Sequence, residues 1–178
     1  MKKIIALALS LMLILFTLSI LAEETAEKTR LGSLKVGEAF TIQSKVPENY
    51  TFSVLTATEL NLVGQLEGEE GKPTVFVSIA YNDEYEGVER FNDVDEATVQ
   101  GIRESFQYMD DVAFEDLETA YGTRLLKVTQ ADKNFADIYT IYKGYELEFI
   151  ITSQDELQDS DIQMLVDFIS DMDFVPAE

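Results

Sequence analysis

The sequence contains no cysteine, no histidine and no tryptophan. Without cysteine the chain can form no disulfide, use no thiolate nucleophile and ligate no iron–sulfur cluster or cysteine-bound zinc. Without histidine it has no Ser-His-Asp triad, no histidine-ligated metal and no imidazole general base. Carboxylates are therefore the only abundant resource for chemistry or metal binding.

Positive charge is also scarce. The 178 residues include 13 basic and 34 acidic side chains, which gives a net charge of −21 at pH 7. Nucleic acid is excluded as a partner, because affinity for it depends on Lys and Arg neutralising phosphates. A hydrophobic content of 46% is too high for a disordered chain, and the length predicts a single globular domain.

The N-terminal segment has the features of an export signal. Lys2 and Lys3 precede a stretch from Ile4 to Ala22 that carries no charge, and Glu23 follows at once. This pattern predicts a Sec-type signal with cleavage after Ala22. The uncharged stretch is also long enough to span a bilayer, so an uncleaved anchor is the alternative. Both predict a secreted or cell-envelope protein that meets the membrane only through this segment.

The remaining chain divides into two parts. Residues 23–37 are polar and highly charged, without a sustained apolar period, and we interpret them as a linker after the signal or anchor of residues 1–22. Residues 38–178 form the single predicted domain.

Short stretches of β-branched and aromatic residues, separated by turn residues, predict strands. They lie at residues 40–42, 50–55, 60–66, 74–81, 112–118, 124–129, 136–142 and 145–152. The connections are short, which predicts antiparallel neighbours; Lys143-Gly144 is one of them. In the last strand Tyr145 and Leu147 point to one face, whereas Glu146 and Glu148 point to the other.

Two amphipathic helices are expected. Asp93 or Asp95 is the predicted N-cap of the first, which should end near Tyr108, and Asp159-Ser160-Asp161 is predicted to cap the second. Their apolar stripes are Val99, Ile102, Phe106 and Met109, and Ile162, Leu165, Phe168, Ile169 and Met172. The predicted fold class is α+β: an antiparallel sheet of about six or seven strands with a mid-chain and a C-terminal helix packed on it, and residues 174–176 returning over the core.

This order of elements resembles the Mog1/PsbP-like group of α/β/α-sandwich domains. The resemblance rests on Lys45-Val46-Pro47-Glu48-Asn49-Tyr50, on the strand at 75–81 with the amphipathic helix after it, and on the C-terminal meander, helix and Asp173-Phe174. It covers residues 39–176 and implies the architecture. Functions in the group range from photosystem assembly to binding a small GTPase, so it implies no site residue here.

Acidic stretches are the candidates for a cation site. Residues 82–86 and 92–96 offer oxygen ligands for calcium, but neither matches the twelve-residue EF-hand loop. We interpret Asp93 and Asp95 as helix caps and the acid-rich segment 144–178, which has no basic residue, as a solvated face. Tyr81 and Tyr85 border the first stretch and are the predicted aromatic residues for exposed contacts.

These observations favour a non-catalytic exported domain that acts as a binding or interaction module at the cell envelope, with an unknown protein or small ligand as its partner. The alternative is a calcium-binding exported domain, and a carboxylate-only hydrolase is third. The sequence assigns no catalytic, cofactor-binding or metal-ligating residue and implies no cofactor.

Overall fold

The structure is a computed structural model that describes residues 28–29, 33–36, 40–58, 61–131 and 134–176. The predicted signal or anchor and its cleavage position after Ala22 lie outside these residues. Within the described ranges, no helix is both long enough and apolar enough to cross a membrane.

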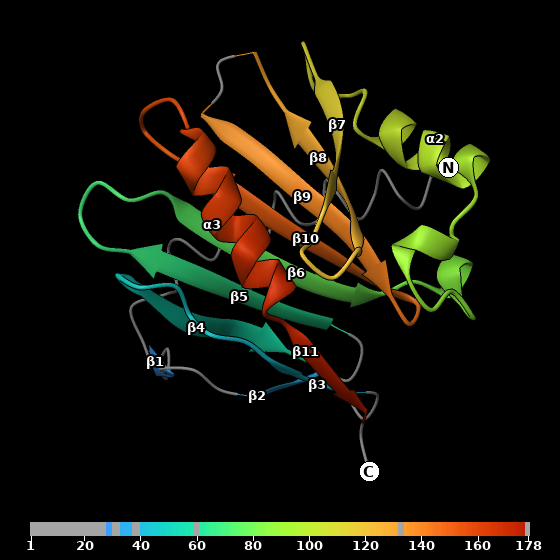
Figure 1. The fold of residues 1–178 in the computed structure, drawn as a ribbon, viewed down its shortest axis with the longest axis horizontal. Helices are drawn as coiled ribbons and strands as arrows, with labels where there is room; N and C mark the ends of the chain where they lie inside the picture. The colour runs from blue at the N-terminus through green and yellow to red at the C-terminus, as the bar shows by residue number, and fades with distance from the viewer. Residues whose placement is uncertain (1–27, 30–32, 37–39, 59–60, 132–133, 177–178) are drawn as a thin grey trace.

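The central element is an antiparallel sheet (Figure 1). Its order across the sheet is β1 (Lys28–Thr29), β4 (Tyr50–Ala57), β5 (Asn61–Gly68), β6 (Thr74–Tyr81), β10 (Tyr145–Thr152), β9 (Phe135–Tyr142), β8 (Arg124–Thr129) and β7 (Ala113–Glu118). The predicted antiparallel α+β fold is confirmed. Strand β10 lies between β6 and β9, so a pairing that is distant in the sequence joins the two halves of the sheet.

The turn between β9 and β10 fixes the register of this central hairpin. Lys143 and Gly144 have φ angles of 50° and 78°, as a two-residue type I′ turn requires. Tyr142 consequently pairs with Tyr145, and every later pair of the hairpin follows from that one. The predicted connection is confirmed.

Helix α3 (Asp159–Ser170) crosses one face of the sheet (Figure 1). Its predicted apolar stripe is confirmed: Leu165, Phe168 and Ile169 are buried against the inward residues of the sheet. The N-cap position is Gln158, one residue earlier than predicted, and Asp161 accepts the backbone N–H of Gln158 at 2.9 Å. The sheet residues of this core include Val75, Val77, Ile79, Ile138, Leu147, Phe149 and Ile151.

Helix α2 (Glu96–Ser105), with the short 3-10 helices η1 (Asp83–Tyr85) and η2 (Phe91–Asp93), covers part of the other face. Ile138 belongs to the α3 cluster, whereas the next residue, Tyr139, belongs to the α2 cluster, and strand alternation puts the two on opposite faces. The α2 cluster joins Val99, Ile102 and Phe106 to Leu126, Val128, Tyr139 and Ile141. The domain therefore has three layers, with helices on both faces of the sheet.

A second sheet of three strands has the order β11 (Asp173–Pro176), β3 (Phe40–Gln43) and β2 (Ser33–Val36). Two strands, β1 and β2, lie within residues 23–37, which the polar composition had assigned to a linker. These short segments are strands because they pair with β4 and β3, and the composition of residues 23–37 does not indicate that pairing. Residues 174–176, predicted to return over the core, form most of β11 and pair with β3.

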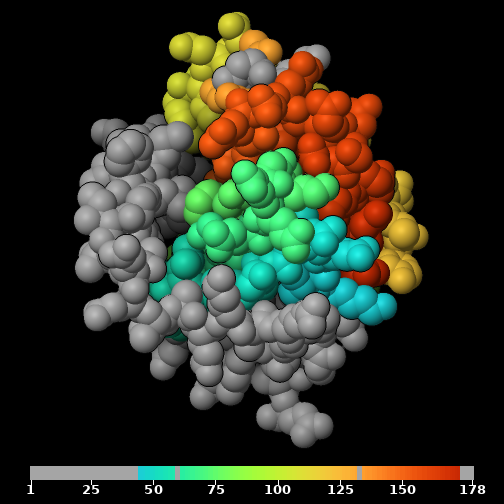
Figure 2. Space-filling view, turned by 90° about the vertical axis from the view of Figure 1, so that its left-hand side faces the viewer, coloured from blue at the N-terminus to red at the C-terminus, as the bar shows by residue number. Residues whose placement is uncertain are grey.

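Figure 2 shows one end of the molecule, where the reversal from β5 to β6 lies between the β4 side and the segment that leads from β10 into α3. The chain passes from β10 to α3 through residues 153–158, whose side chains are mostly exposed.

Candidate functional site

Three carboxyl side chains share the sheet face that α3 does not cover. Asp137 lies on β9, and Glu146 and Glu148 lie on β10; we call these three residues the acidic face. Glu148 pairs with Tyr139, and Asp137 pairs with Ile150. Asp137 and Glu148 are thus diagonal neighbours on adjacent strands, a position in which long side chains reach one another.

Asp137 is the most buried residue of the acidic face. Only 3% of its surface is exposed, and its Oδ1 atom is buried without a hydrogen-bond partner. Glu146 and Glu148 are partly exposed. None of the four ion pairs in the described part of the chain involves these three carboxyls. A buried carboxylate without a cation is costly, so this arrangement strongly favours the neutral acid.

The protonation of these groups reflects that cost. Burial raises the pKa of Asp137 from 3.8 to about 7. Burial also raises the pKa of Glu148 well above its ordinary value, and the negative charges of Asp137 and Glu146 raise it further. Two like charges at neighbouring positions in a poorly solvated site disfavour double ionisation, so the pair titrates as one unit.

Glu146 differs from its neighbours because it has hydrogen-bond donors. The Tyr139 hydroxyl donates to Glu146 Oε1 at 2.8 Å. Burial raises the pKa of Glu146, whereas hydrogen bonds from Tyr139 and Asn82 lower it. Burial keeps the pKa of Tyr139 well above 10, so its hydroxyl remains a donor at neutral pH. Glu146 is therefore fixed in orientation beside the less constrained pair.

Tyrosine side chains lie on both faces of this part of the sheet. Tyr108 follows α2 and is 53% exposed; burial, and then the negative charges of Asp137 and Glu148, raise its pKa. Tyr85 is only 6% exposed, so its predicted role in exposed contacts is wrong: its ring packs in the α2 cluster. On the opposite, α3 face of the sheet, Tyr81 is 37% exposed and packs edge-on against Tyr145, with 5.3 Å between ring centroids.

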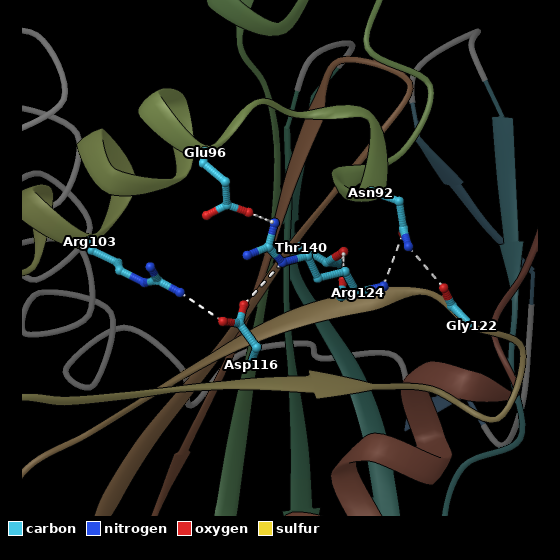
Figure 3. Close-up of polar contacts among 7 residues, drawn as sticks. All are labelled: Asn92, Glu96, Arg103, Asp116, Gly122, Arg124 and Thr140. Atoms are coloured by element: carbon cyan, nitrogen blue, oxygen red, sulfur yellow. Dashed lines mark hydrogen bonds and ion pairs between the residues drawn. The ribbon is translucent and has the colours of Figure 1, made fainter.

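A polar network attaches α2 to the sheet beside this face (Figure 3). Arg124 on β8 donates to Asp116 Oδ1 at 3.0 Å and to Glu96 Oε1 at 2.8 Å, and its guanidinium lies 5.4 Å from the Phe91 ring centroid. Arg103 of α2 donates to the other Asp116 oxygen at 2.7 Å. Both arginines are thereby paired with acids of α2 and β7.

Asn92 extends this network to the loop between β7 and β8 (Figure 3). Its amide nitrogen donates to the Gly122 carbonyl at 3.0 Å, and its Oδ1 accepts the Arg124 backbone N–H at 3.0 Å. The Thr140 hydroxyl donates to the Arg124 carbonyl at 3.0 Å. This network has a structural role, since it seats η2 and α2 on β8 and β9.

The acidic stretches considered for calcium serve as caps. Asp95 is the N-cap of α2 and accepts the Thr98 N–H at 2.9 Å, and Asp93 accepts the Arg90 N–H at 3.2 Å. Asn82 caps η1 by accepting the Glu84 N–H at 3.0 Å. The interpretation of Asp95 as a helix cap is confirmed, whereas Asp93 is the last residue of η2 and forms the capping box of that short helix with Arg90. In the described ranges no group of three or more acids is placed to hold a metal ion.

A cavity of about 250 Å³ lies on the α3 side of the sheet, where the helix begins above β7 and β8. Its charged residues are of both signs, and Lys127 is paired with Glu115 of β7. The lining comprises Leu117, Glu118, Lys127, Asp159, Ile162, Gln163 and Val166. These residues do not converge on one point with a single kind of chemistry, so the acidic face remains the better candidate site.

Sequence reasoning did not identify Asp137. It placed Glu146 and Glu148 on the correct face but assigned them to a solvated surface, which is wrong in part because both are partly buried. The available signal was Asp137 itself, an acid within an otherwise apolar strand whose residues 136–141 are all buried. An acid in a strand buried on both faces must face either a partner or a ligand site.

Comparison with protein-family models, with curated proteins and with solved structures finds no match for this chain in any of the three. The resemblance to Mog1/PsbP-like domains therefore stays a prediction, while the antiparallel α+β architecture is what the structure shows.

Proposed function

We propose that this chain is an exported, non-catalytic binding domain whose acidic face takes an organic cation, an ammonium or guanidinium group that carries N–H donors. The observation that carries the proposal is the buried, unpartnered Oδ1 of Asp137 beside Glu148. An N–H donor of a cation would supply both the missing hydrogen bond and the missing charge.

The chemistry of the site fits this ligand. Hydrogen bonds between ionised groups are shorter and stronger than neutral ones, and a poorly solvated carboxyl strengthens them further. Glu146 and Glu148 are partly exposed, whereas the neighbouring Asp137 is almost entirely buried. Tyr108 is 53% exposed, and the charges of Asp137 and Glu148 raise its pKa, so its ring is the aromatic group that we propose for cation–π contact with the ligand. The net charge of −21 also raises the local concentration of cations.

The acidic face suits an extended ligand better than a compact metal ion. Its carboxyls are distributed along two strands, and Glu146 already accepts a hydrogen bond from Tyr139. Calcium requires six to eight oxygen ligands around one point. Calcium is therefore the appropriate control cation for the proposed organic ligand.

Calorimetric titration of the full-length protein tests the proposal. The probes are agmatine and spermidine, with tetramethylammonium as a cation without N–H donors and calcium as a metal ion. We expect agmatine or spermidine to bind and Asp137→Asn to weaken that binding about tenfold or more, or ~1.4 kcal/mol. Asp155→Asn removes an exposed acid and is the matched control. Equal affinity of the two variants, or binding of calcium alone, would contradict the proposal.

The proposed location has its own test. Export through residues 1–22 predicts that the mature chain begins at Glu23, whereas an uncleaved anchor keeps Met1 or Lys2 at the N-terminus. Intact-mass measurement of protein recovered from the producing cell's envelope and medium separates these outcomes, and recovery only from the cytoplasm would refute export.

A carboxylate-dependent hydrolase is the second candidate function, and one observation favours it. Acid–base hydrolysis needs one protonated and one ionised carboxyl, and the raised pKa values of Asp137 and Glu148 provide such a pair near neutral pH. A panel of fluorogenic glycosides tests this function. Turnover that Asp137→Asn and Glu148→Gln each abolish, and that Asp155→Asn leaves intact, would favour the enzyme over the binding domain.

A further inference from the structure

We propose that Asp137 and Glu148 share one proton in the free protein and release it to solvent when a cation binds, so that ligand binding is coupled to pH. This inference rests on the proposed function, because it concerns the same acidic face. It adds a regulatory property: the domain takes up its ligand in neutral or alkaline surroundings and releases it in acidic ones.

The geometry supports a shared proton. The two carboxyls come from adjacent strands, point to the same face and are diagonal neighbours in the register of the β9–β10 hairpin. Asp137 is almost entirely buried, and its Oδ1 has no hydrogen-bond partner. A proton on one carboxyl removes one of two like charges and creates an O–H donor for the other.

In the described part of the chain, no ion pair gives these two carboxyls a positive charge that would remove the need for that proton. On β10 the neighbouring group on the same face is Glu146, whose charge raises the pKa of Glu148, and on β9 the neutral Tyr139 lies opposite Glu148. From the segment after α2 it meets Tyr108, and from β6 Ser78 lies opposite Glu148.

The groups farther along the same face are also accounted for. Glu84 and Tyr85 of η1 act on Glu146 and Tyr139 rather than on the pair. Arg124 of β8 and Arg103 of α2 are held by Glu96 and Asp116. Arg90, immediately before η2, is exposed, and among the described residues no ion pair joins Arg90, Arg103 or Arg124 to Asp137 or Glu148.

The proton balance follows from these contacts. In the free protein the pair consists of one carboxylic acid and one carboxylate, with a charge of −1. Binding of a cation favours the doubly ionised pair, so the acid's O–H bond breaks and the proton passes to buffer. One proton is released for each ligand bound. Burial raises the pKa of Asp137 to about 7, so the pair carries its proton below about that pH. By linkage, the affinity for the cation then falls about tenfold for each unit by which the pH decreases further.

Calorimetry of the full-length protein with agmatine tests this coupling, because agmatine keeps its charge between pH 5 and 8. Titrations in phosphate and in Tris, whose ionisation enthalpies differ, count the protons released. We expect close to one proton per agmatine at pH 6 and an affinity that rises about tenfold between pH 5 and 6. Asp137→Asn should abolish both effects, and Asp155→Asn should preserve them.

A carboxyl ¹³C NMR titration of the free protein provides a second measurement that needs no ligand. A midpoint near 7 for one of the two side chains supports the shared proton, whereas normal midpoints near 4 for both overturn it. Binding of agmatine without proton release and without pH dependence overturns the coupling and leaves the proposed function standing. Failure of every organic cation to bind overturns both.

Discussion

Replacing Asp137 by Asn should make the domain more stable at neutral and alkaline pH. In the folded protein Asp137 holds its proton up to about pH 7, whereas in the unfolded chain an Asp side chain releases it near pH 4. Between these values the folded state binds more protons than the unfolded state. The free energy of unfolding of the wild-type protein therefore falls as the pH rises from about 4 to about 7.

The size of the effect follows from the difference between the two pKa values. A rise from 3.8 to about 7 corresponds, at ~1.4 kcal/mol per unit, to a loss of about 4 kcal/mol at pH 8. Coupling to Glu148 shares this cost between two groups, so we expect the Asn variant to gain about 2–4 kcal/mol at pH 8. At pH 4 the gain should be small, because the wild-type carboxyl is then neutral in the folded state and only about half ionised in the unfolded state.

Urea unfolding at pH 4, 5, 6, 7 and 8, followed by circular dichroism, measures this dependence. The wild-type curve should decline with pH, and the Asp137→Asn curve should be clearly shallower, with the remaining slope due to Glu148. Asp155→Asn, at an exposed position after β10, should run parallel to the wild type. Parallel curves for Asp137→Asn and wild type would show that Asp137 is not buried as an acid, and the reasoning would fail.

Three further substitutions test the framework around the site. Arg124→Met should lower the free energy of unfolding by about 1–2 kcal/mol in chemical denaturation, because it removes two ion pairs and a cation–π contact. This loss should become smaller in high salt, and a loss that salt does not change would point to packing alone. Gly64→Ala should lower the free energy of unfolding by about 1–3 kcal/mol in the same assay, since the new Cβ would lie 2.4 Å from the Phe52 ring. Unchanged stability would mean that the ring can move aside. Asp95→Ala should lower the denaturation midpoint through the lost cap on the Thr98 N–H, whereas Asp95→Asn should retain most of the stability. Equal losses for the two variants would argue against capping.

Local patterns predicted much of the fold. Three strands, Thr74–Tyr81, Arg124–Thr129 and Tyr145–Thr152, have the bounds that their β-branched and aromatic residues indicated. Helix α2 begins after Asp95, as its capping chemistry predicts, and ends at Ser105 rather than near Tyr108. Propensity, alternation and capping act over a few residues, so a single sequence carries them.

The same locality explains the failures. The strands β1 and β2 lie in a polar stretch whose structure depends on pairing with distant strands, and composition contains no record of that pairing. Tyr85 borders an acidic loop and looked exposed, yet η1 turns its ring into the α2 cluster. Burial depends on which segments return over a residue, and these segments are far away in the sequence.

At the acidic face, the sequence determines which residues share a face, and the tertiary structure determines which of them are buried. Alternation in β10 and the two-residue turn at Lys143-Gly144 determine that Glu148 and Asp137 share one face as diagonal neighbours. The sequence alone determines this much, because hairpin register is a short-range property. Only the tertiary structure decided that Asp137 is buried and that its Oδ1 lacks a partner. The cost of a buried charge depends on the groups around it, and Asp137 is flanked in the sheet by Val128 of β8 and Ile150 of β10, which are distant from each other in the sequence.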